Sequence, residues 1–475
     1  MLVIAPILMI FDYQIGLIIL EILALGLAAS IFVQPQFQRH LPRAMLVLLL
    51  VVFLLPLLHL IPLPLSFWQW LPGRAELAQA ITQASAAEVQ AMPLSLVPFL
   101  TEYAWLGLLP PLMVFLFVVG LPSDRIRTLC YVFLGMATFQ ALLGLMQYGA
   151  GPQSLLRFGG KMGSHSANGT YPNYDHLAGL LEMALPMALA ILAASVGVAH
   201  DKRRHLRTVR QRLSFFLNKY VNISAIYGAI AIVLLLGLIF TQSRTGVMLA
   251  MLLIACSAVA FSRRLGGSNV FGTLGTYVAV GLSLALIVGL VPILNRFTLL
   301  DPLQDARWLI YQTTFEAILK YFPLGTGAGT FGQAYLEFHP LEIAGRFVNS
   351  AHNDYLEWIM EGGIVAVMLI IGFIYFYLRR WTQVWVGGHW SKFRSLQVGA
   401  GIGMLMLMLH GLVDFNLQIA ANQIYFAFLA AVFFHQAHEK VHHKTVPAVT
   451  ATPQEKTPAP IKVYPVQPGS NPFAD

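Results

Sequence analysis

The stretch NSAHNDYLEWIMEGG contains side chains that could carry out acid–base chemistry at the mouth of an apolar segment. Histidine is a residue type that can take a proton from a hydroxyl group, and His352 is the candidate here. Asn353, Tyr355 and Glu357 follow it directly, and Glu357, about one helical turn on, could orient the imidazole or cap a helix. A structural interpretation stands beside this one, because Asn353 and Asp354 are natural N-caps and His352 would then be a buried, satisfied ring.

Two arginines could bind an anion near this histidine. Arg244 follows Ser243 between two apolar runs that have almost no loop between them. A charged side chain at such a place costs roughly 3 kcal/mol on insertion, unless it only extends its guanidinium to the membrane surface. Arg307 lies in a longer polar segment and suits bidentate phosphate contact, although Asp305 or Asp301 could simply pair with it.

Further polar residues enter apolar runs at two other places. They either pack between helices or line a cavity, and the sequence leaves both interpretations open. These residues are Asn173, Asp175, His176, Asp414, Asn416 and Asn422. No Cys/His spacing indicates a zinc site, and we expect no metal and no cofactor. Cys130 and Cys256 lie inside apolar runs, which is typical of small core side chains.

The composition indicates an integral membrane protein. Of the 475 residues, 57% are hydrophobic and only 11% charged, whereas a soluble domain has about 25% charged residues. The long apolar runs predict an all-α fold and exclude a membrane barrel, whose segments are short and alternating. The net charge of +8 fits basic cytoplasmic loops and requires no nucleic-acid partner.

Eleven stretches are long and apolar enough to cross a bilayer, and residues 2–12 could add a short twelfth. The eleven are 14–33, 43–61, 98–119, 126–148, 177–198, 222–240, 244–261, 272–294, 356–378, 396–412 and 419–436. Counting spans places the basic loops on one face, which the positive-inside rule assigns to the cytoplasm. These loops contain Arg125 and Arg127, residues 202–212, Arg263 and Arg264, and Arg379 and Arg380.

The opposite face then receives segments 62–97, 150–176, 295–355 and 413–418, and in a bacterium it faces the periplasm. We expect residues 1–437 to form one polytopic membrane domain, in which 295–355 is the one large periplasmic loop. Within this loop, 315–321 predicts a short helix and the glycine-rich 323–329 a tight turn. Residues 438–475 are rich in proline and polar residues, which predicts a disordered cytoplasmic tail.

Two outward-facing arginines and one histidine on a large membrane domain suit a lipid-linked anionic substrate such as a pyrophosphate. The arginines would bind the diphosphate and offset charge on the leaving group. The histidine would deprotonate an acceptor hydroxyl.

Several motifs together resemble the O-antigen ligase and O-antigen polymerase superfamily of bacterial envelope glycan transferases, over roughly residues 170–430. The motifs are residues 173–179, Ser243-Arg244-Thr245, Arg307-Trp308, 322–331, His352 to Gly363, and His410 with Asp414 to Leu417. Their order and spacing carry the resemblance, because each one alone is weak.

The resemblance implies a metal-independent, inverting glycosyltransferase in the bacterial inner membrane, with its active site facing the periplasm. The donor would be a glycan on undecaprenyl diphosphate and the acceptor lipid A–core or another glycan, among membrane lipids. Matching the motifs of the family to this sequence makes His352 the base and Arg244 a ligand of the diphosphate. Arg307 is matched as a second diphosphate ligand, but Arg296 and Arg346 lie in the same loop and could be matched instead.

O-antigen ligation to lipid A–core is the function that we expect from this resemblance. Polymerisation of O-antigen or exopolysaccharide is the alternative, followed by transfer of oligosaccharide to a protein. A solute transporter is a non-enzymatic alternative, but such proteins tend to show inverted repeats and polar residues at mid-membrane. Here we find no repeat, and the polar residues lie at the outer ends of the spans.

Overall fold

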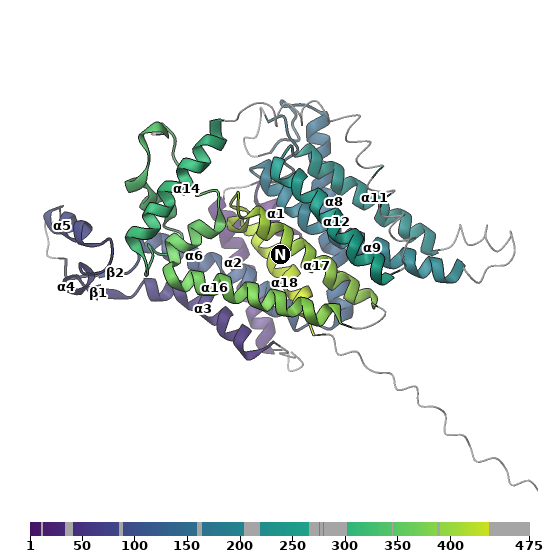
Figure 1. Ribbon diagram of the computed structural model, residues 1–475, viewed down its shortest axis with the longest axis horizontal. Helices are drawn as coiled ribbons and strands as arrows, with labels where there is room; N and C mark the ends of the chain where they lie inside the picture. The colour runs from purple at the N-terminus through teal and green to yellow at the C-terminus, as the bar shows by residue number, and fades with distance from the viewer. Residues whose placement is uncertain are drawn as a thin grey trace, which may run out of the picture. The chain divides into compact units, whose positions relative to one another are not determined.

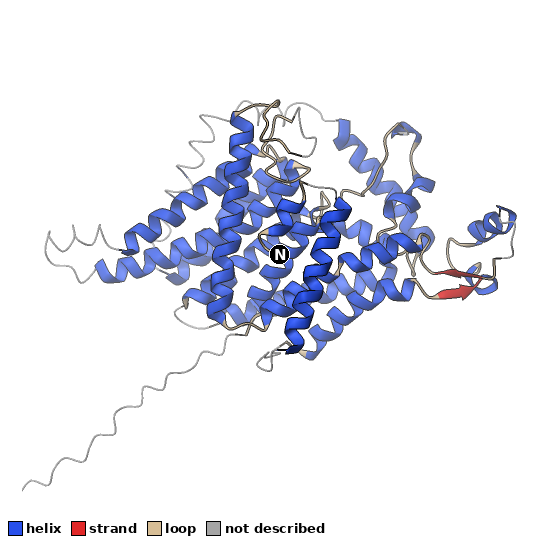
Figure 2. Ribbon diagram, turned by 180° about the vertical axis from the view of Figure 1, so that it is seen from behind, coloured by secondary structure: helices blue, strands red, loops and turns tan. Residues whose placement is uncertain are grey.

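The computed structural model describes residues 1–10, 13–33, 41–84, 89–158, 164–203, 219–265, 302–343, 345–386 and 390–436, with single positions 275 and 279. Nearly all regular structure in this part of the chain is helical (Figures 1 and 2). Apart from positions 275 and 279, the expected span 272–294 lies outside the described residues, as does the tail 438–475. Met1–Gln436 is one compact unit.

Seven of the described helices or helix pairs are long and apolar enough to cross a membrane, which confirms an all-α membrane protein. They are α2 (Tyr13–Val33), α6 (Pro98–Gly107) with α7 (Leu109–Val119), α8 (Ser123–Gly149), α9 (Tyr174–Arg203), α11 (Lys219–Phe240), α12 (Arg244–Leu265) and α16 (Asp354–Trp385). Shorter apolar helices α3 (Arg43–His59) and α18 (Ala420–Phe434), and α17 (Lys392–His410), occupy three further expected spans.

Helix α9 is at the centre of the packing. In its apolar stretch 89% of the residues are buried, compared with 22% to 50% in the other spans. It packs against α11, α12 and α17, and small residues permit the close approach. A Cβ added at Gly403 of α17 would lie 2.7 Å from the carbonyl oxygen of Met183 on α9. This packing brings the end of α11, the start of α12 and the end of α17 together near the start of α9.

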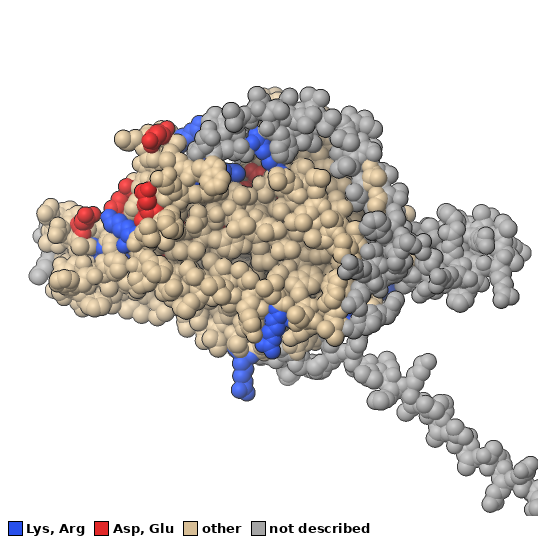
Figure 3. Space-filling model, in the orientation of Figure 1, with Lys and Arg blue, Asp and Glu red and all other residues tan. Residues whose placement is uncertain are grey.

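Charged side chains mark the ends of the membrane domain. In Figure 3, Lys, Arg, Asp and Glu appear at the top, bottom and left of the described surface, and its broad middle is tan. Such a band without visible charge is what a bilayer-facing surface requires. The exposed side chain of Arg379 lies near the end of α16, and His352 lies just before its start. Most of the candidate span of 32 residues lies between them, so these two groups lie near opposite ends of α16.

The segment between α3 and α6 forms a small lobe. Strands β1 (Pro62–Pro64) and β2 (Ala91–Pro93) pair antiparallel, with Leu63 opposite Met92, and are accompanied by α4 (Leu65–Trp68) and α5 (Ala75–Ala84). The buried guanidinium of Arg74 donates to the carbonyl oxygens of Leu94 at 2.7 Å and Gly325 at 2.9 Å. Burial lowers the pKa of Arg74 to about 10, so the charge is retained at neutral pH. Arg74 thereby ties the lobe to the glycine-rich turn.

The expectation of a short helix at 315–321 is wrong in length. These residues are the end of α14 (Pro302–Tyr321), a helix of 20 residues that packs against α16 (Figure 1). On one face of this helix, Ile310, Ala317 and Ile318 are buried in a second core with Phe331 and Tyr335. The length of the helix therefore depends on the burial of this face against the rest of the protein. The seven-residue pattern at 315–321 does not indicate that burial. The short helices of this region are α15 (Phe331–Ala334), η1 (Tyr335–Phe338) and η2 (Leu341–Ile343), and α1 (Ile4–Leu8) and η3 (Asn416–Gln418) lie elsewhere in the unit.

The glycine-rich turn is bonded to a break in α16. The amides of Thr326 and Gly327 donate to the carbonyls of Met360 and Glu361, at 3.0 and 2.9 Å. At the break Gly363 has φ 56° and ψ −139°, and a Cβ there would lie 2.0 Å from the carbonyl oxygen of Pro323. Only glycine fits this left-handed position against the turn.

We predict that Gly363→Ala destabilises the protein by roughly 2 kcal/mol or more, because the substitution adds backbone strain and a clash with the turn. The measurement is the thermal unfolding midpoint of the purified protein in detergent. Gly135→Ala in α8 is the matched control, since a Cβ there meets no heavy atom within 4 Å. Equal midpoints for the two variants would contradict the role of Gly363.

Candidate active site

His352 is held just outside the first turn of α16. The side chain of Asn353 accepts from the amides of Tyr355 and Leu356, both at 3.1 Å, and so caps the helix. His352 itself has φ 50°, which turns it out of the helical path. The hydroxyl of Tyr311 on α14 donates to the carbonyl oxygen of His352 at 2.8 Å. The backbone of His352 is thereby fixed from both α14 and α16.

Glu357 supports the turn before the histidine. Its buried carboxylate accepts from the hydroxyl of Ser350 and the amide of Ala351, both at 2.8 Å. Tyr355 points elsewhere, because its hydroxyl donates to the carbonyl oxygen of Met408. Asn353, Tyr355 and Glu357 thus hold the backbone around His352, and a different residue orients the ring.

That residue is Asp414, which lies between α17 and α18. Its Oδ1 is 3.2 Å from Nδ1 of His352. The carboxylate side chain is 2% exposed and the imidazole 26% exposed, so the ring alone reaches the surface. Nδ1 is engaged by the carboxylate, and Nε2 is therefore the nitrogen that can accept a proton. Sequence analysis named both residues without pairing them, since 62 positions separate them.

Positive charge and hydrogen bonding keep Asp414 ionised. Burial alone would raise its pKa, but the hydrogen bond from His352 and the charges of His176 and His410 hold the pKa of Asp414 below its ordinary value. The ring of Phe415 lies edge-on to His176 at 4.9 Å and to His352 at 5.1 Å, between centroids. An ionised Asp414 can stabilise an imidazolium at His352.

The start of α9 contributes the next polar groups. The side chain of Asn173 accepts from the amide of Asp175 at 3.1 Å, which supports the first turn of the helix. His176 is buried, and its carbonyl oxygen accepts from Asn422 at 3.0 Å. Asp175, His410 and Asp414 have ligand atoms that all lie within 4.8 Å of one another. These residues therefore form one polar cluster beneath His352.

The two arginines approach this cluster from separate helices. Arg244 begins α12 directly after Ser243, whose Oγ accepts from the amide of Gly246 at 3.1 Å and whose side chain also bonds to Asp175. Arg307 lies on α14 one turn before Tyr311, and its charge acts on both Tyr311 and Asp175. Both guanidinium groups are half-buried. The fold thus gathers His352, Ser243, Arg244 and Arg307 around the start of α9.

Three members of the cluster were missed or given no role by sequence analysis. Tyr311 gave no signal, because its hydrogen bond is to a backbone carbonyl. Burial raises the pKa of Tyr311, although the charge of Arg307 opposes this, so its hydroxyl keeps the proton that it donates. Glu182 and His410 could have been found as a carboxylate within an apolar run and a histidine four residues before Asp414.

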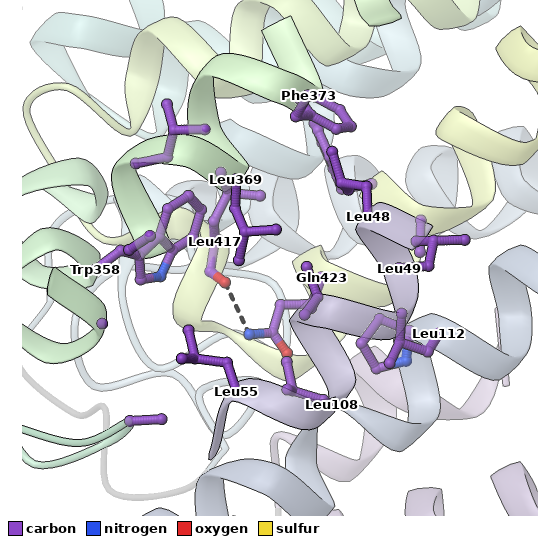
Figure 4. Close-up of a pocket in the computed structure, with 18 of the residues that line it drawn as sticks. Leu48, Leu49, Leu55, Leu108, Leu112, Trp358, Leu369, Phe373, Leu417 and Gln423 are labelled. Carbon is purple, nitrogen blue, oxygen red and sulfur yellow. Dashed lines mark hydrogen bonds between the residues drawn. The ribbon is translucent and has the colours of Figure 1, made fainter. Parts of the chain in front are cut away.

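An apolar cavity of about 380 Å³ lies beside this site, between α3, α7, α16 and α18. Leucine and aromatic side chains form most of its wall, among them Leu48, Leu112 and Phe373 (Figure 4). Gln423 donates to the carbonyl oxygen of Leu417 within it. Tyr355 also lines the cavity, so the space begins one turn of α16 away from His352. Its chemistry suits a hydrocarbon chain.

Comparison with known proteins gives one family. Residues 229–371 match the family model described as O-antigen ligase, and this segment includes Arg244, Arg307 and His352. None of the curated proteins matches the chain. The matched segment covers α12, α14 and the first half of α16, the elements that present the candidate base and both arginines. The chain is thus a multi-pass membrane protein in which residues 229–371 are similar to the O-antigen ligase domain.

Proposed function

We propose that this protein transfers a glycan from undecaprenyl diphosphate to an acceptor hydroxyl, with lipid A–core as the acceptor. Glycan transfer of the ligase or polymerase type is the general activity of the superfamily. The observation that carries the proposal is the contact between His352 and the buried Asp414. Arg307 acts on the neighbouring Asp175, and Arg244 directly follows Ser243, which bonds to the same Asp175. This combination supplies a base and an anion site at one end of the membrane domain.

In the proposed reaction, the acceptor oxygen attacks the anomeric carbon of the donor sugar. Nε2 of His352 takes the proton of that hydroxyl, and Asp414 stabilises the resulting imidazolium. The bond between the anomeric carbon and the diphosphate oxygen breaks as the new glycosidic bond forms. One direct displacement inverts the anomeric carbon, and undecaprenyl diphosphate leaves with the bonding electron pair.

Arg244 and Arg307 bind the diphosphate in this mechanism. Negative charge grows on the bridging phosphate oxygen during bond breaking, and a guanidinium can offset it through two parallel hydrogen bonds. The arginines take the place that a divalent cation has in other diphosphate-using enzymes, so we propose a metal-independent reaction that needs no cofactor. The apolar cavity beside α16 supports a lipid-linked donor or acceptor.

We propose that the site faces the periplasm of a bacterial inner membrane. In a protein whose Cys130 and Cys256 are replaced by Ala, Arg346→Cys should react with a membrane-impermeant maleimide in spheroplasts. Arg379→Cys should react only after the membrane is opened, because exposed Arg346 precedes the start of α16 and exposed Arg379 lies near its end. The reverse labelling pattern would place the site in the cytoplasm.

His352→Ala should lower glycan transfer by roughly 100-fold or more, because it removes the group that is proposed to take the hydroxyl proton. The measurement is the surface glycan profile of a deletion strain that carries either the wild-type or the variant copy. The control is His339→Ala, a loop histidine whose Nε2 contacts the carbonyl oxygen of Arg346; it should restore the wild-type profile.

The products that accumulate in this strain show which of the possible acceptors the protein uses. Uncapped lipid A–core, together with long glycan on the carrier, identifies a ligase. Single repeat units in place of long chains identify a polymerase, and an unchanged lipopolysaccharide with an unmodified glycoprotein identifies protein transfer. A wild-type profile in His352→Ala would show that the histidine only shapes the end of α16.

Arg244→Lys should lower transfer by roughly 10-fold or more, because one ammonium cannot reproduce a bidentate guanidinium contact with a diphosphate. Transfer by the purified protein, measured across donor concentrations, checks this. Arg379→Lys is the matched control, since that exposed arginine lies at the other end of α16. Full activity in Arg244→Lys would remove this residue from the diphosphate site.

A further inference from the structure

A second acid–imidazole pair lies below the site and is not used by the mechanism above. Nδ1 of His410, at the end of α17, is 3.0 and 3.1 Å from the two carboxylate oxygens of Glu182 on α9. Both residues are fully buried. Glu182 lies two helical turns inside the most buried span of the unit. Ionisable groups at such depth are expensive unless they are paired, and they commonly have a function.

The pair approaches the candidate base through a charge contact with Asp414 and not through a hydrogen bond, since Nε2 of His410 and Oδ2 of Asp414 have no hydrogen-bond partner among the described residues. Nε2 of His410 is 4.0 Å from Oδ2 of Asp414, and Oδ1 of the same carboxylate is 3.2 Å from Nδ1 of His352. The four side chains therefore alternate between carboxylate and imidazole. They connect α9 and α17 to the residue that precedes α16.

We propose that Glu182 and His410 are positioning residues that act through Asp414 on His352. The carboxylate of Glu182 holds His410 in the form with a proton on Nδ1 and stabilises positive charge on its ring. That charge faces Asp414 and keeps its carboxylate ionised and turned toward His352. The inference rests on the proposed function, because it assigns His352 the role of base.

A cation bound by Asp175, His410 and Asp414 is the competing explanation of this cluster. Two observations favour the chain of side chains. Oδ1 of Asp414 is already engaged by His352, and Asp175 interacts with Ser243 and Arg307. Each acidic group of the trio thus has a protein partner of its own.

The proposal predicts the direction in which the pH dependence of transfer moves. In Glu182→Gln, His410 loses the anion that stabilises its charge, and Asp414 then has less positive charge beside it. Asp414 will bind a proton more readily, and, where it stays ionised, it will stabilise the protonated form of His352 more strongly. Both effects mean that a higher pH is needed before His352 is free to accept a proton. The acid limb of the rate–pH profile, where the rate rises with pH, therefore moves to higher pH.

Glu182→Gln leaves the other ionisable groups around Asp414 unchanged, so the wild type and this variant share them. They are Asp175 and His176 on α9, Arg307 and Tyr311 on α14, Asp354 and Glu357 on α16, and His352 itself. Only the partner of His410 changes.

The experiment measures kcat and KM for the purified full-length protein with polyprenyl-diphosphate glycan, between pH 5 and pH 9. Glu182→Gln should lower kcat by roughly 10- to 100-fold, with KM nearly unchanged and the acid limb moved to higher pH. Glu182→Asp keeps a carboxylate, so it should recover part of kcat and the wild-type limb. If Glu182→Gln does not accumulate, His410→Gln removes the same charge from the other residue of the pair.

Gln397→Leu is the matched control for structural damage. Gln397 is a buried polar residue at the far end of α17 that donates to the carbonyl oxygen of His435 at 2.7 Å. This variant should lower the amount of folded protein without moving the limb or the kcat of the protein that remains. In an Asp414→Asn background, Glu182→Gln should add little further loss, because its effect passes through Asp414.

Three outcomes would overturn the proposal. The first is a wild-type profile in Glu182→Gln, and the second is a lower kcat with no movement of the limb in either charge-removing variant. The third is loss of transfer with EDTA that a divalent cation restores, which would assign the cluster to a metal. A wild-type protein without glycan transfer would instead defeat the proposed function, so the two failures are distinguishable.

Discussion

A buried carboxylate stays ionised only where hydrogen-bond donors and positive charge replace the water that it has lost, and the site depends on Asp414 meeting this condition. His352 bonds to one oxygen, and the charges of His176 and His410 act on the same group. These partners come from α9, from α17 and from the residue before α16. The packing of those helices therefore determines the charge of Asp414, the group that contacts His352.

The backbone of the site is restrained as firmly as its charges. The break at Gly363 lets the glycine-rich turn bond to α16, and Arg74 ties that turn to the lobe after α3. From α14, Tyr311 reaches the carbonyl oxygen of His352. A displacement of α14 would thus move both His352, the proposed base for the acceptor hydroxyl, and Arg307, the proposed ligand of the leaving diphosphate. Rigid elements with these cross-links suit a reaction that relies on orientation.

The sequence predicted the membrane helices well, because composition and run length decide where a span can form. It also named His352, Asp414 and both arginines as candidates, since charged residues beside apolar runs are conspicuous. It could not pair His352 with Asp414 or give Glu182 a role, because those contacts arise only when α9, α16 and α17 pack. The length of α14 was underestimated for a related reason: its buried face has meaning only against Phe331 and Tyr335, which follow in the chain.

The structural and catalytic interpretations of His352 are parts of one arrangement. Asn353 caps α16, and this cap needs an extended backbone at the residue just before the helix. His352 precedes the cap with φ 50°, outside the helix, where its ring can meet Asp414 and the surface. Had His352 been one position later, it would occupy the cap and its ring would follow the helix axis. The cap is therefore the local feature that places a half-exposed imidazole over an ionised, buried carboxylate.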